Sequence, residues 1–343
     1  MKSDSYKAAG VDIDLAQKLL SGMKSKIAAA RRPEMLAPIG GFGGLFELDL
    51  SKYNKPVIVS SVDGVGTKLM IAMMMNKFDT IGYDIVNHCI NDIAVCGAEP
   101  LYFMDYIGIG KLRSPLYEEV LSGIADACKL ANCALLGGET AEMPGMYGDD
   151  FDLVGSITGV VEKENLINGE NIKPGHIAVG MASNGLHTNG YSLARHIIFD
   201  KCRYDVHTEL KELGTTIGDA LLKPHTCYWG AVEKVMQSTV SLDGMAHITG
   251  GGLYDNVPRI LPKTVNVEFD SSALPVPPIM KLINDAGNIA KSEAYRVFNM
   301  GIGMVLFVPE SDADKTVELC RDAGYETEIC GKVSAGDGTV IVD

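Results

Sequence analysis

The stretch Val57-Ile-Val-Ser-Ser-Val-Asp63-Gly-Val-Gly-Thr-Lys68 is an apolar run that breaks into Asp-Gly-x-Gly-Thr-Lys. Its first six residues are mostly β-branched and lie between Pro56 and Gly64, which predicts a buried strand with Asp63 at its carboxyl end. Open α/β sheets bind ligands at the carboxyl ends of their strands. We therefore expect the rest of the chain to be arranged around Asp63.

The residues that follow this strand suit a polyphosphate with its metal ion. Gly64 and Gly66 have no side chains to block a close approach, and Thr67 and the backbone amides can donate hydrogen bonds. Lys68 supplies a point charge. The motif is not a Walker A loop, in which the lysine precedes Ser or Thr. A tight turn with a surface lysine explains the same residues equally well.

Length and charge limit the class of protein. At 343 residues the chain exceeds the size at which one core stops growing, so two domains are expected. The net charge of -14 argues against nucleic acid or an anionic membrane as a partner. The first six residues hold no apolar signal-peptide core and no apolar run could cross a bilayer, which predicts a cytoplasmic location. The eight cysteines form no Cys-x-x-Cys pair, which favours reduced thiols.

A predicted helix from Tyr83 to Gly97 carries a second set of polar side chains. On one face lie Asp84, Asn87, His88, Asn91 and Asp92, without any Lys or Glu. A solvated face would normally include longer charged residues, so this face suits the wall of a site, with Asp92 a candidate magnesium ligand beside Asp63. For His88, a hydrogen-bonded core histidine is the simpler interpretation.

A second strand, beginning near Cys133, ends in two glycines and a carboxylate. Gly137, Gly138 and Glu139 repeat the arrangement of the first strand, so we expect two strands to deliver acids to one sheet edge. Earlier in the chain, the glycine-rich segment 38–46 lacks the spacing of a dinucleotide fingerprint. It is equally consistent with a lid over a nucleotide and with a simple surface loop.

The second half of the chain contains two glycine-rich loops between a strand and a helix. The first lies at 183–190 and precedes a helix from Tyr191 to about Asp200; the second lies at 247–252 and contains three consecutive glycines. Such loops bind phosphate through backbone amides, although helix capping alone is the alternative. The end of the chain, 326–342, is predicted to form a hairpin that turns near Gly336.

Six stretches, in this order, resemble the phosphoribosylformylglycinamidine cyclo-ligase family, also called aminoimidazole ribonucleotide (AIR) synthetases. They are SVDGVGTK (61–68), HCINDIAVCGAEP (88–100), GGETAEMPGMY (137–147), SNGLHTNGYSLAR (183–195), AHITGGGLYDNVPRIL (246–261) and RVFNMGIGM (296–304). The resemblance implies an α+β fold with two mixed α/β domains, 1–168 for ATP binding and dimerisation and 169–343 contributing to the substrate site. It also implies a homodimer whose first-domain sheets join into a barrel.

The resemblance further implies ATP-dependent cyclisation of formylglycinamidine ribonucleotide to AIR, with ADP and phosphate released. ATP is expected to contact Asp63, Gly64, Gly66, Thr67, Lys68, Asp92, Gly137, Gly138 and Glu139. Mg2+ is expected on Asp63, Asp92 and Glu139. The ribonucleotide is expected on Ser183, Asn184, His187, Thr188, Asn189, Thr249, Gly250, Gly251 and Gly252. The expected catalytic residues are His187, His247 and Lys68, with the two histidines as candidates for proton transfer.

Two competing functions stay open on the sequence alone. A small-molecule kinase of the same fold would keep the aspartates, but its product would carry the phosphate. A nucleotide-binding module without enzymatic activity would not need the paired glycine loops of the second half. Phosphate release therefore separates the first alternative from the cyclo-ligase, and turnover with the ribonucleotide separates the second.

Overall fold

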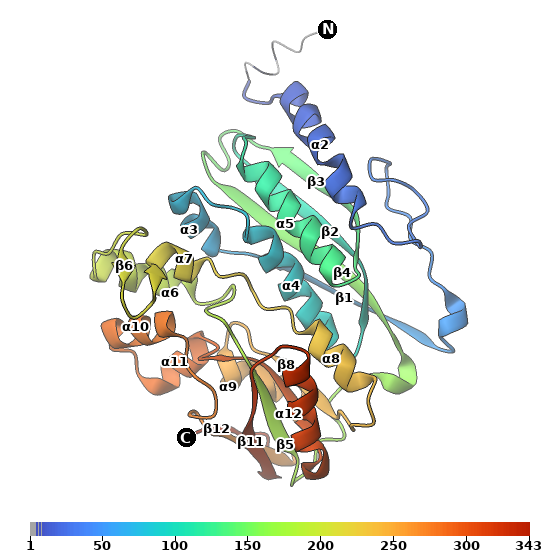
Figure 1. Ribbon diagram of the computed structural model, residues 1–343, viewed down its shortest axis with the longest axis vertical. Coiled ribbons are helices and arrows are strands. Elements are labelled where there is room, and N and C mark those ends of the chain that lie inside the picture. The colour runs from blue at the N-terminus through green and yellow to red at the C-terminus, as the bar shows by residue number, and fades with distance from the viewer. Residues whose placement is uncertain (1–4, 6, 8) are drawn as a thin grey trace. The chain divides into compact units, whose positions relative to one another are not determined.

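The computed structural model describes residue 5, residue 7 and residues 9–343 (Figure 1). The start of the chain, where the absence of a signal peptide was predicted, thus lies largely outside the described residues. The chain divides into two compact units, of which the first comprises Met1–Ile93 and Glu99–Glu162 and the second Ala94–Ala98 and Lys163–Asp343. The division falls at Glu162, slightly before the predicted boundary at residue 168.

The first unit is built on a four-stranded sheet with the order β1-β4-β2-β3. Its strands are β1 (Pro56–Gly64), β2 (Glu99–Ile109), β3 (Ala134–Glu142) and β4 (Phe151–Glu162). β4 is antiparallel to both β1 and β2, and β3 is parallel to β2. The strands β1, β2 and β3 therefore run in one direction, with β1 and β3 as the two outer strands.

Helices cover one face of this sheet, as the ribbon in Figure 1 shows for α4 and α5. The helices are α2 (Ile13–Ala28), α3 (Lys68–Met75), α4 (Ile81–Ala94) and α5 (Leu116–Leu130), with a short 3-10 turn η1 (Leu50–Lys52) before β1. At Gly82 of α4 an added Cβ would lie 2.2 Å from the backbone nitrogen of Ile124. Only glycine allows the two helices to approach this closely.

The opposite face of the sheet exposes apolar side chains. Ile58 and Val62 of β1 are 54% and 66% exposed, and Met104 of β2 is 39% exposed. On the helix-covered face, by contrast, Phe103 and Ile157 are fully buried. Side chains alternate between the faces of a strand, so the sheet has one packed face and one open apolar face.

The second unit contains a six-stranded sheet with the order β12-β9-β11-β5-β10-β8. Its strands are β5 (Ile177–Ala182), β8 (Gly244–His247), β9 (Val265–Phe269), β10 (Ile302–Val308), β11 (Thr327–Ala335) and β12 (Val340–Val342). The predicted hairpin at the end of the chain is wrong. β11 and β12 do not pair with each other. β9 lies between them and forms backbone hydrogen bonds with β11 on one edge and with β12 on the other.

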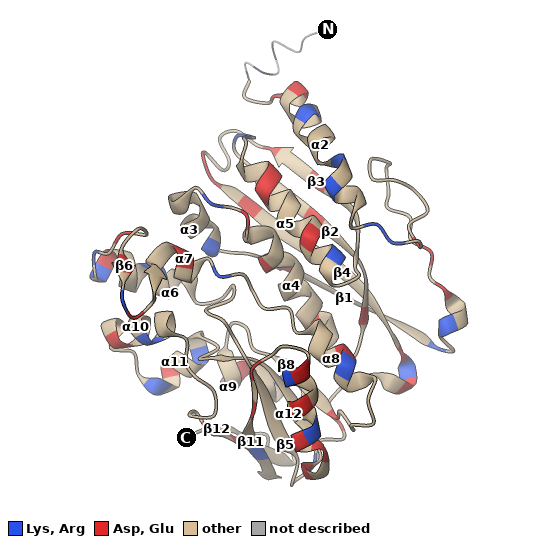
Figure 2. Cartoon of the chain, in the orientation of Figure 1, with Lys and Arg blue, Asp and Glu red and all other residues tan. Residues whose placement is uncertain are grey.

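Short helices surround this sheet. They are α6 (Tyr191–Arg195), continued by a π-helical turn η3 (His196–Lys201), α7 (Ile217–Leu221), α8 (Trp229–Met236), α9 (Gly252–Asn256), α10 (Pro278–Gly287), α11 (Lys291–Val297) and α12 (Ala313–Asp322). Single 3-10 turns are η2 (Lys163–Asn165), η4 (Val257–Arg259) and η5 (Glu310–Asp312), and β6 (Glu209–Leu210) pairs with β7 (Thr215–Thr216). Acidic and basic residues alternate along α12 in Figure 2, as on a solvated helix surface.

Candidate functional site

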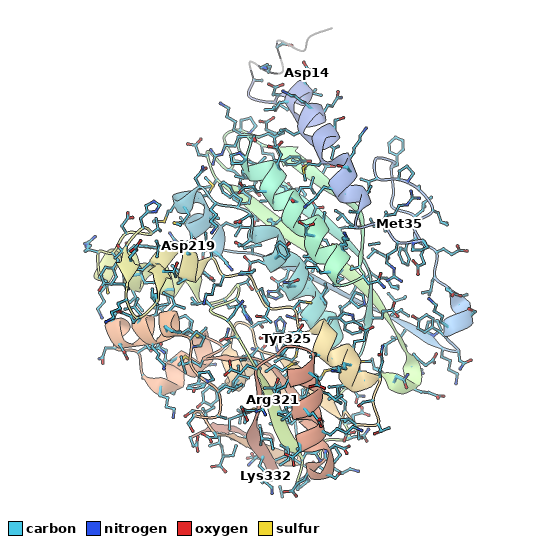
Figure 3. All side chains as sticks on the ribbon, in the orientation of Figure 1. Asp14, Met35, Asp219, Arg321, Tyr325 and Lys332 are labelled. Atoms are coloured by element: carbon cyan, nitrogen blue, oxygen red, sulfur yellow. The ribbon has the colours of Figure 1, made fainter. Side chains whose placement is uncertain are left out.

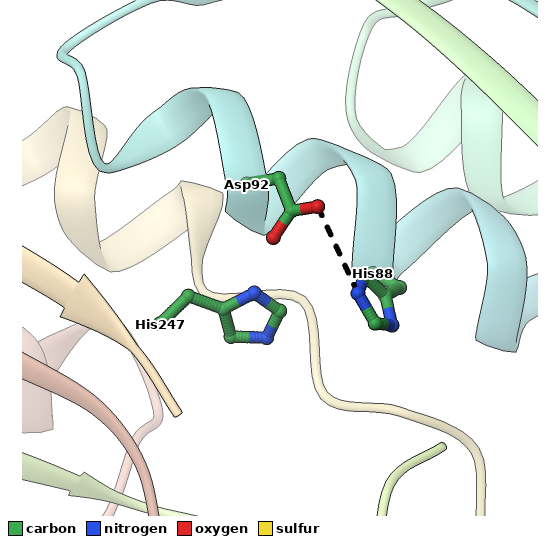
Figure 4. Close-up of side chains that lie close together, drawn as sticks. All are labelled: His88, Asp92 and His247. Carbon is green, nitrogen blue, oxygen red and sulfur yellow. Dashed lines mark ion pairs between the residues drawn. The ribbon is translucent and has the colours of Figure 1, made fainter. Parts of the chain in front are cut away.

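Two carboxylates of the first unit share one histidine. His88 Nε2 on α4 lies 3.0 Å from Asp63 Oδ2 at the end of β1. The same nitrogen lies 3.7 Å from Asp92 Oδ2, one helical turn further along α4, and Figure 4 shows this pair. The Asp92 carboxylate also accepts a hydrogen bond from Ser61 Oγ at 3.0 Å, and the backbone amide of Gly64 lies 2.6 Å from Asp63 Oδ1. The predicted grouping of Asp63 with Asp92 is therefore present in the structure.

The two carboxylates favour the charged form of the histidine in this cluster. Burial acts to lower the pKa of His88, but the hydrogen bond to Asp63 and the charge of Asp92 raise it overall. Burial acts to raise the pKa of Asp63, but the hydrogen bond from His88 lowers it overall. A protonated His88 balances part of the negative charge of the two carboxylates, whose oxygens are the hard ligands that Mg2+ prefers. His88 is a hydrogen-bonded core histidine that also belongs to the site.

Lys68 lies buried in an ion pair with Asp84. Its side chain is 0% exposed, and its Nζ lies 2.7 Å from Oδ1 of Asp84, which is also 0% exposed. Burial lowers the pKa of Lys68, while the neighbouring Asp84 carboxylate opposes this shift. The alternative of a surface lysine is therefore wrong, while the phosphate contact and catalytic role of Lys68 stay predictions. The ion pair ties the start of α3 to α4 within the core.

Glu139 lies on the opposite edge of the sheet from Asp63. The pairing registers align Asp63 with Gly155 of β4, Asp105 of β2 and Gly138 of β3. Neighbouring strands are about 4.8 Å apart, so three intervals separate the outer strands by about 14 Å. The two acids thus lie at the same level of parallel strands, as predicted, but on the two outer strands, so Glu139 cannot share an ion with Asp63 within one sheet.

The glycine-rich loop of the first unit covers a cavity of about 380 Å³. Backbone hydrogen bonds close the base of the loop, from Leu36 N to Leu45 O at 3.0 Å and from Glu47 N to Glu34 O at 2.9 Å. At Gly44 an added Cβ would lie 2.4 Å from the Leu136 side chain, so this glycine is needed where the loop meets β3. The loop carries no charged residue and appears entirely tan in Figure 2. The polar groups that this loop can present to a ligand are therefore mainly its backbone amides.

Polar groups converge at the floor of this cavity. Gly137, Gly138 and Glu139 line it as predicted for a ligand site, together with Asp105 and Tyr117. Burial raises the pKa of Tyr117, whereas its hydrogen bond with Thr140 opposes the shift. The remaining walls are mostly apolar. An apolar cavity with a few convergent polar groups is the usual form of a small-molecule site.

Asp105 is the most perturbed carboxylate at this floor. It is 9% exposed, and burial, reinforced by the charge of Glu139, raises its pKa to about 7. Its carboxylate lies directly over Gly138, where an added Cβ would be 2.3 Å from Asp105 Oδ1. Asp105 is absent from the predicted site residues. The signal for it was a single carboxylate within the otherwise apolar run Leu101–Ile109.

In the second unit the two predicted loops lie next to each other. β5 and β8 both run antiparallel to β10, so their carboxyl ends lie at the same edge of the sheet and both loops start there. An added Cβ on Gly250 would lie 3.1 Å from Asn189 Oδ1 of the other loop. The structure therefore brings segments 183–190 and 247–252 together, as a shared ligand site requires. Their contact with a ribonucleotide stays a prediction.

Two buried asparagines hold these loops in place. Asn299 accepts from Ser183 Oγ at 2.7 Å and donates to the Gly185 carbonyl at 3.0 Å. Asn256 donates from Nδ2 to the carbonyls of Thr249 and Gly252, at 3.3 and 2.8 Å. Ser183 and Thr249 therefore have structural partners as well as their predicted ligand role. The helix after the second loop, α9, is a single turn, so the amides of the loop matter more than a helix dipole.

The two predicted catalytic histidines are linked by a third. His225 Nε2 lies 3.0 Å from His247 Nε2, and the ring of His225 stacks on His187 with centroids 4.1 Å apart. All three side chains are buried. His225 lies in a connection between α7 and α8 and follows no motif, so the sequence offered no signal for it.

Comparisons with known proteins agree with this architecture. The AIR synthase related protein N-terminal domain matches residues 49–161, and the C-terminal domain of the same family matches residues 173–343. Among solved structures, thiamine-monophosphate kinase from Stenotrophomonas maltophilia is similar with a TM-score of 0.68 at 16% identity, over 94% of this chain and 95% of that one. The hydrogenase maturation protein HypE in complex with ATP is similar with a TM-score of 0.69 at 16% identity, over 95% and 90%. At this identity the two structures show the fold alone.

Much more similar sequences extend over the whole chain. The phosphoribosylformylglycinamidine cyclo-ligase of Thermoanaerobacter sp. (strain X514) is 47% identical over 98% of this chain and 100% of its own length. Those of Syntrophotalea carbinolica and Shouchella clausii are each 46% identical, over 99% of this chain and 98% of their own lengths. Within the described part of the chain, none of the helices has the length and apolar character of a membrane span. The matches include both domains, and the chain therefore belongs to the phosphoribosylformylglycinamidine cyclo-ligase family.

Proposed function

We propose that this chain uses ATP to close the imidazole ring of AIR from formylglycinamidine ribonucleotide through an iminophosphate. The formyl oxygen attacks the γ-phosphorus of ATP, and the bond to ADP breaks. A nitrogen of the same molecule then attacks the formyl carbon, the carbon–oxygen bond breaks, and phosphate leaves with that oxygen. The observation that carries the proposal is the 47% identity to a named cyclo-ligase over nearly the full length of both chains.

The route makes chemical sense because an amide oxygen is a poor leaving group and phosphate is a good one. Once the oxygen is phosphorylated, ring closure takes place within one bound molecule, where proximity lowers the barrier. The protein's contribution is to position the reactants and to neutralise charge. The loops 183–190 and 247–252 are the proposed ribonucleotide site, with His187 and His247 as proton-transfer groups.

Isotope labelling tests this reaction. Substrate with heavy oxygen in the formyl group should give labelled inorganic phosphate, in step with the formation of AIR and ADP. Unlabelled phosphate would exclude the iminophosphate route. A phosphorylated product that retains the label, without phosphate release, would instead identify a small-molecule kinase of this fold.

We propose that the cavity beneath the glycine-rich loop holds part of ATP. Its volume of about 380 Å³ is within the range of small-molecule sites. The loop amides, Gly137 and Gly138 would contact the nucleotide, and the loop anchored at its base would act as the lid. Gly138→Ala tests this, because its methyl group would displace the Asp105 carboxylate, and ATP affinity should fall. Unchanged affinity would remove this cavity from the nucleotide site.

Mg2+ fits Asp63 and Asp92 better than the predicted three-ligand set. The oxygens of both aspartates lie within 3.7 Å of the same His88 nitrogen, so one ion could contact both carboxylates. When bound, Mg2+ would neutralise phosphate charge. His88 contacts both carboxylates and so holds them close together before the ion arrives. Asp63→Asn and Asp92→Asn should each raise the magnesium concentration needed for ATP turnover. If turnover of both variants depends on magnesium concentration as in the wild type, Asp63 and Asp92 do not hold the ion.

A homodimer would explain why two acidic sites lie on opposite edges of one sheet. The open face, with Ile58, Val62 and Met104 exposed, is the proposed contact surface. In a twofold dimer each surface meets its own copy, so Asp63 of one protomer could approach Glu139 of the partner. Each ATP site would then contain residues from two chains.

Mixing two impaired variants tests this composite site. Asp63→Asn and Glu139→Gln should each show little turnover alone at a magnesium concentration that is sufficient for the wild type. After unfolding and joint refolding, half of the dimers are mixed and one of their two sites is intact, which restores roughly a quarter of wild-type turnover. A site within one chain would give no recovery, and sedimentation as a monomer at micromolar concentration would exclude the dimer itself. Joint refolding of the wild type serves as the control for yield.

A further inference from the structure

Three histidines of the second unit lie in one buried stack. His187 and His225 are each 1% exposed and His247 is 6% exposed. The rings of His187 and His225 are nearly parallel, with 22° between their planes, and the rings of His225 and His247 are 5.1 Å apart. His187 lies within the loop 183–190 and His247 begins the loop 247–252, whereas His225 comes from a different part of the chain.

The contact between His225 and His247 restricts their protonation. Their Nε2 atoms are 3.0 Å apart, a distance at which one nitrogen donates and the other accepts. Two Nε2–H groups would repel each other, and two lone pairs would form no bond. In two neutral rings, therefore, one carries its proton on Nε2 and the other carries its proton on Nδ1.

The hydrogen bonds continue from His225 to a side chain near the surface. His225 Nδ1 lies 3.3 Å from Thr188 Oγ1, and Thr188 is half-buried. A threonine hydroxyl can donate one hydrogen bond and accept two. Asn189 Nδ2 donates to the same oxygen at 3.5 Å. The three groups Thr188, His225 and His247 thus form one chain in which every link can carry a proton in either direction.

The segment that carries His225 is held in place from several sides. Asn184 Nδ2 donates to the Pro224 carbonyl at 2.8 Å, and the Tyr228 hydroxyl donates to the Ala182 carbonyl at 2.9 Å. Tyr325, labelled beyond α12 in Figure 3, donates from its hydroxyl to the Cys227 carbonyl at 2.6 Å. These bonds attach the segment to β5, to the loop after β5 and to the connection between α12 and β11. Hydrogen bonds to the backbone of this segment therefore fix the position of His225 relative to His247.

We propose that Thr188, His225 and His247 form a proton relay in which His225 is a positioning residue that sets the tautomer of His247. The proposal rests on the proposed function, in which ring closure releases a proton from a substrate nitrogen. His247 takes this proton on Nδ1 and passes its Nε2 proton to His225 Nε2. His225 passes its Nδ1 proton to Thr188, whose hydroxyl proton goes to water. One proton enters at His247 and one leaves at Thr188, so the relay is balanced.

The first test uses the tautomers themselves and needs no turnover. In protein with 15N-labelled histidine, nitrogen shifts and two-bond couplings distinguish Nδ1–H from Nε2–H rings. We expect His225 and His247 to be neutral in opposite tautomers. In His225→Phe, which keeps a flat ring against His187, the single tautomer of His247 should be lost. Equal tautomers in the wild type, or an unchanged His247 signal in His225→Phe, would overturn the relay.

The second test measures turnover. His225→Phe should lower kcat by about tenfold to a hundredfold, the usual cost of losing a partner that orients a functional histidine, with KM for ATP unchanged. His225→Gln keeps an amide donor near the lost Nε2 and should recover part of kcat, and it serves as the folding-competent variant if His225→Phe is unstable. The matched control is His207→Phe, which removes an exposed histidine of the same unit. Wild-type kcat in His225→Phe would overturn the role of His225.

The two tests separate the relay from the proposed function. If the wild-type protein forms no AIR, the proposed function fails, while the tautomer measurement still decides whether the relay exists. If AIR forms at the normal rate in His225→Phe, the proposed function stands and the relay is wrong. A purely structural role would lower thermal stability without lowering kcat of the folded fraction or changing the His247 tautomer, and this result would also overturn the proposal.

Discussion

Replacing Asp105 by Asn should stabilise the first unit at alkaline pH. The pKa of Asp105 is raised from an ordinary value of 3.8 to about 7, mainly by burial. An acid with a raised pKa binds its proton more tightly in the folded protein, so stability falls as pH rises from about 4 to about 7. The difference of about three pKa units corresponds to about 4 kcal/mol at pH 8. Asparagine has nearly the same shape and no proton to lose.

The assay compares the wild type with Asp105→Asn in urea at pH 4.5 and pH 8. The one tryptophan, Trp229, lies in α8 of the second unit, so its fluorescence follows a unit that the substitution does not touch. Hydrogen exchange of β2 amides follows the first unit instead. We expect a gain of only about 1 kcal/mol for Asp105→Asn at pH 4.5 and a much larger gain at pH 8, in the β2 signal alone. Asp149→Asn, at an exposed aspartate of the same unit, is the control.

Two results would refute this reasoning. Equal stability of the variant and the wild type at pH 8 would mean that the folded Asp105 carboxylate ionises without a penalty. A loss of stability at both pH values would mean that the carboxylate makes a favourable contact that asparagine cannot replace. If the variant is more stable and also loses ATP turnover, the acid is kept at the floor of the cavity for function at the expense of stability.

Two further predictions concern packing. Lys68→Met should destabilise the first unit by about 3 to 5 kcal/mol in urea unfolding, because it leaves the buried Asp84 carboxylate without its cation, and adding Asp84→Leu should recover much of the loss; a mild effect of Lys68→Met alone would contradict this. Gly252→Ala should impair folding of the second unit, followed by Trp229 fluorescence, because its backbone has φ +57° and an added Cβ would lie 1.9 Å from the Tyr295 carbonyl oxygen. Normal thermal stability of Gly252→Ala would show that the loop can relax.

Local patterns predicted most strands and helices correctly. The β-branched run before Asp63 forms β1, and the polar segment from Tyr83 to Gly97 forms a helix, α4, as predicted. The i, i+4 spacing of His88 and Asp92 places both on one face of α4, next to Asp63. These features depend on residues close together in the sequence or on the period of one element, which a sequence displays directly.

Such local patterns do not predict which strands pair when the strands are far apart in the sequence. The end of the chain was expected to be a hairpin, but β9, about sixty residues earlier, pairs with both β11 and β12. Strand order likewise placed Glu139 on the edge opposite Asp63. Alternation along a strand shows which residues share a face, but it does not show which strand becomes the neighbour.

By itself the sequence determined the family, the two-domain α+β organisation and the residues that lie at strand ends, because motifs, length and periodicity are local. Tertiary structure alone decided that Lys68 is buried against Asp84, that Asp105 forms the floor of a cavity and that His225 joins His247. Whether a charged side chain faces a ligand or the core depends on what surrounds it after folding. Those surroundings come from distant segments, and only the packed chain brings them together.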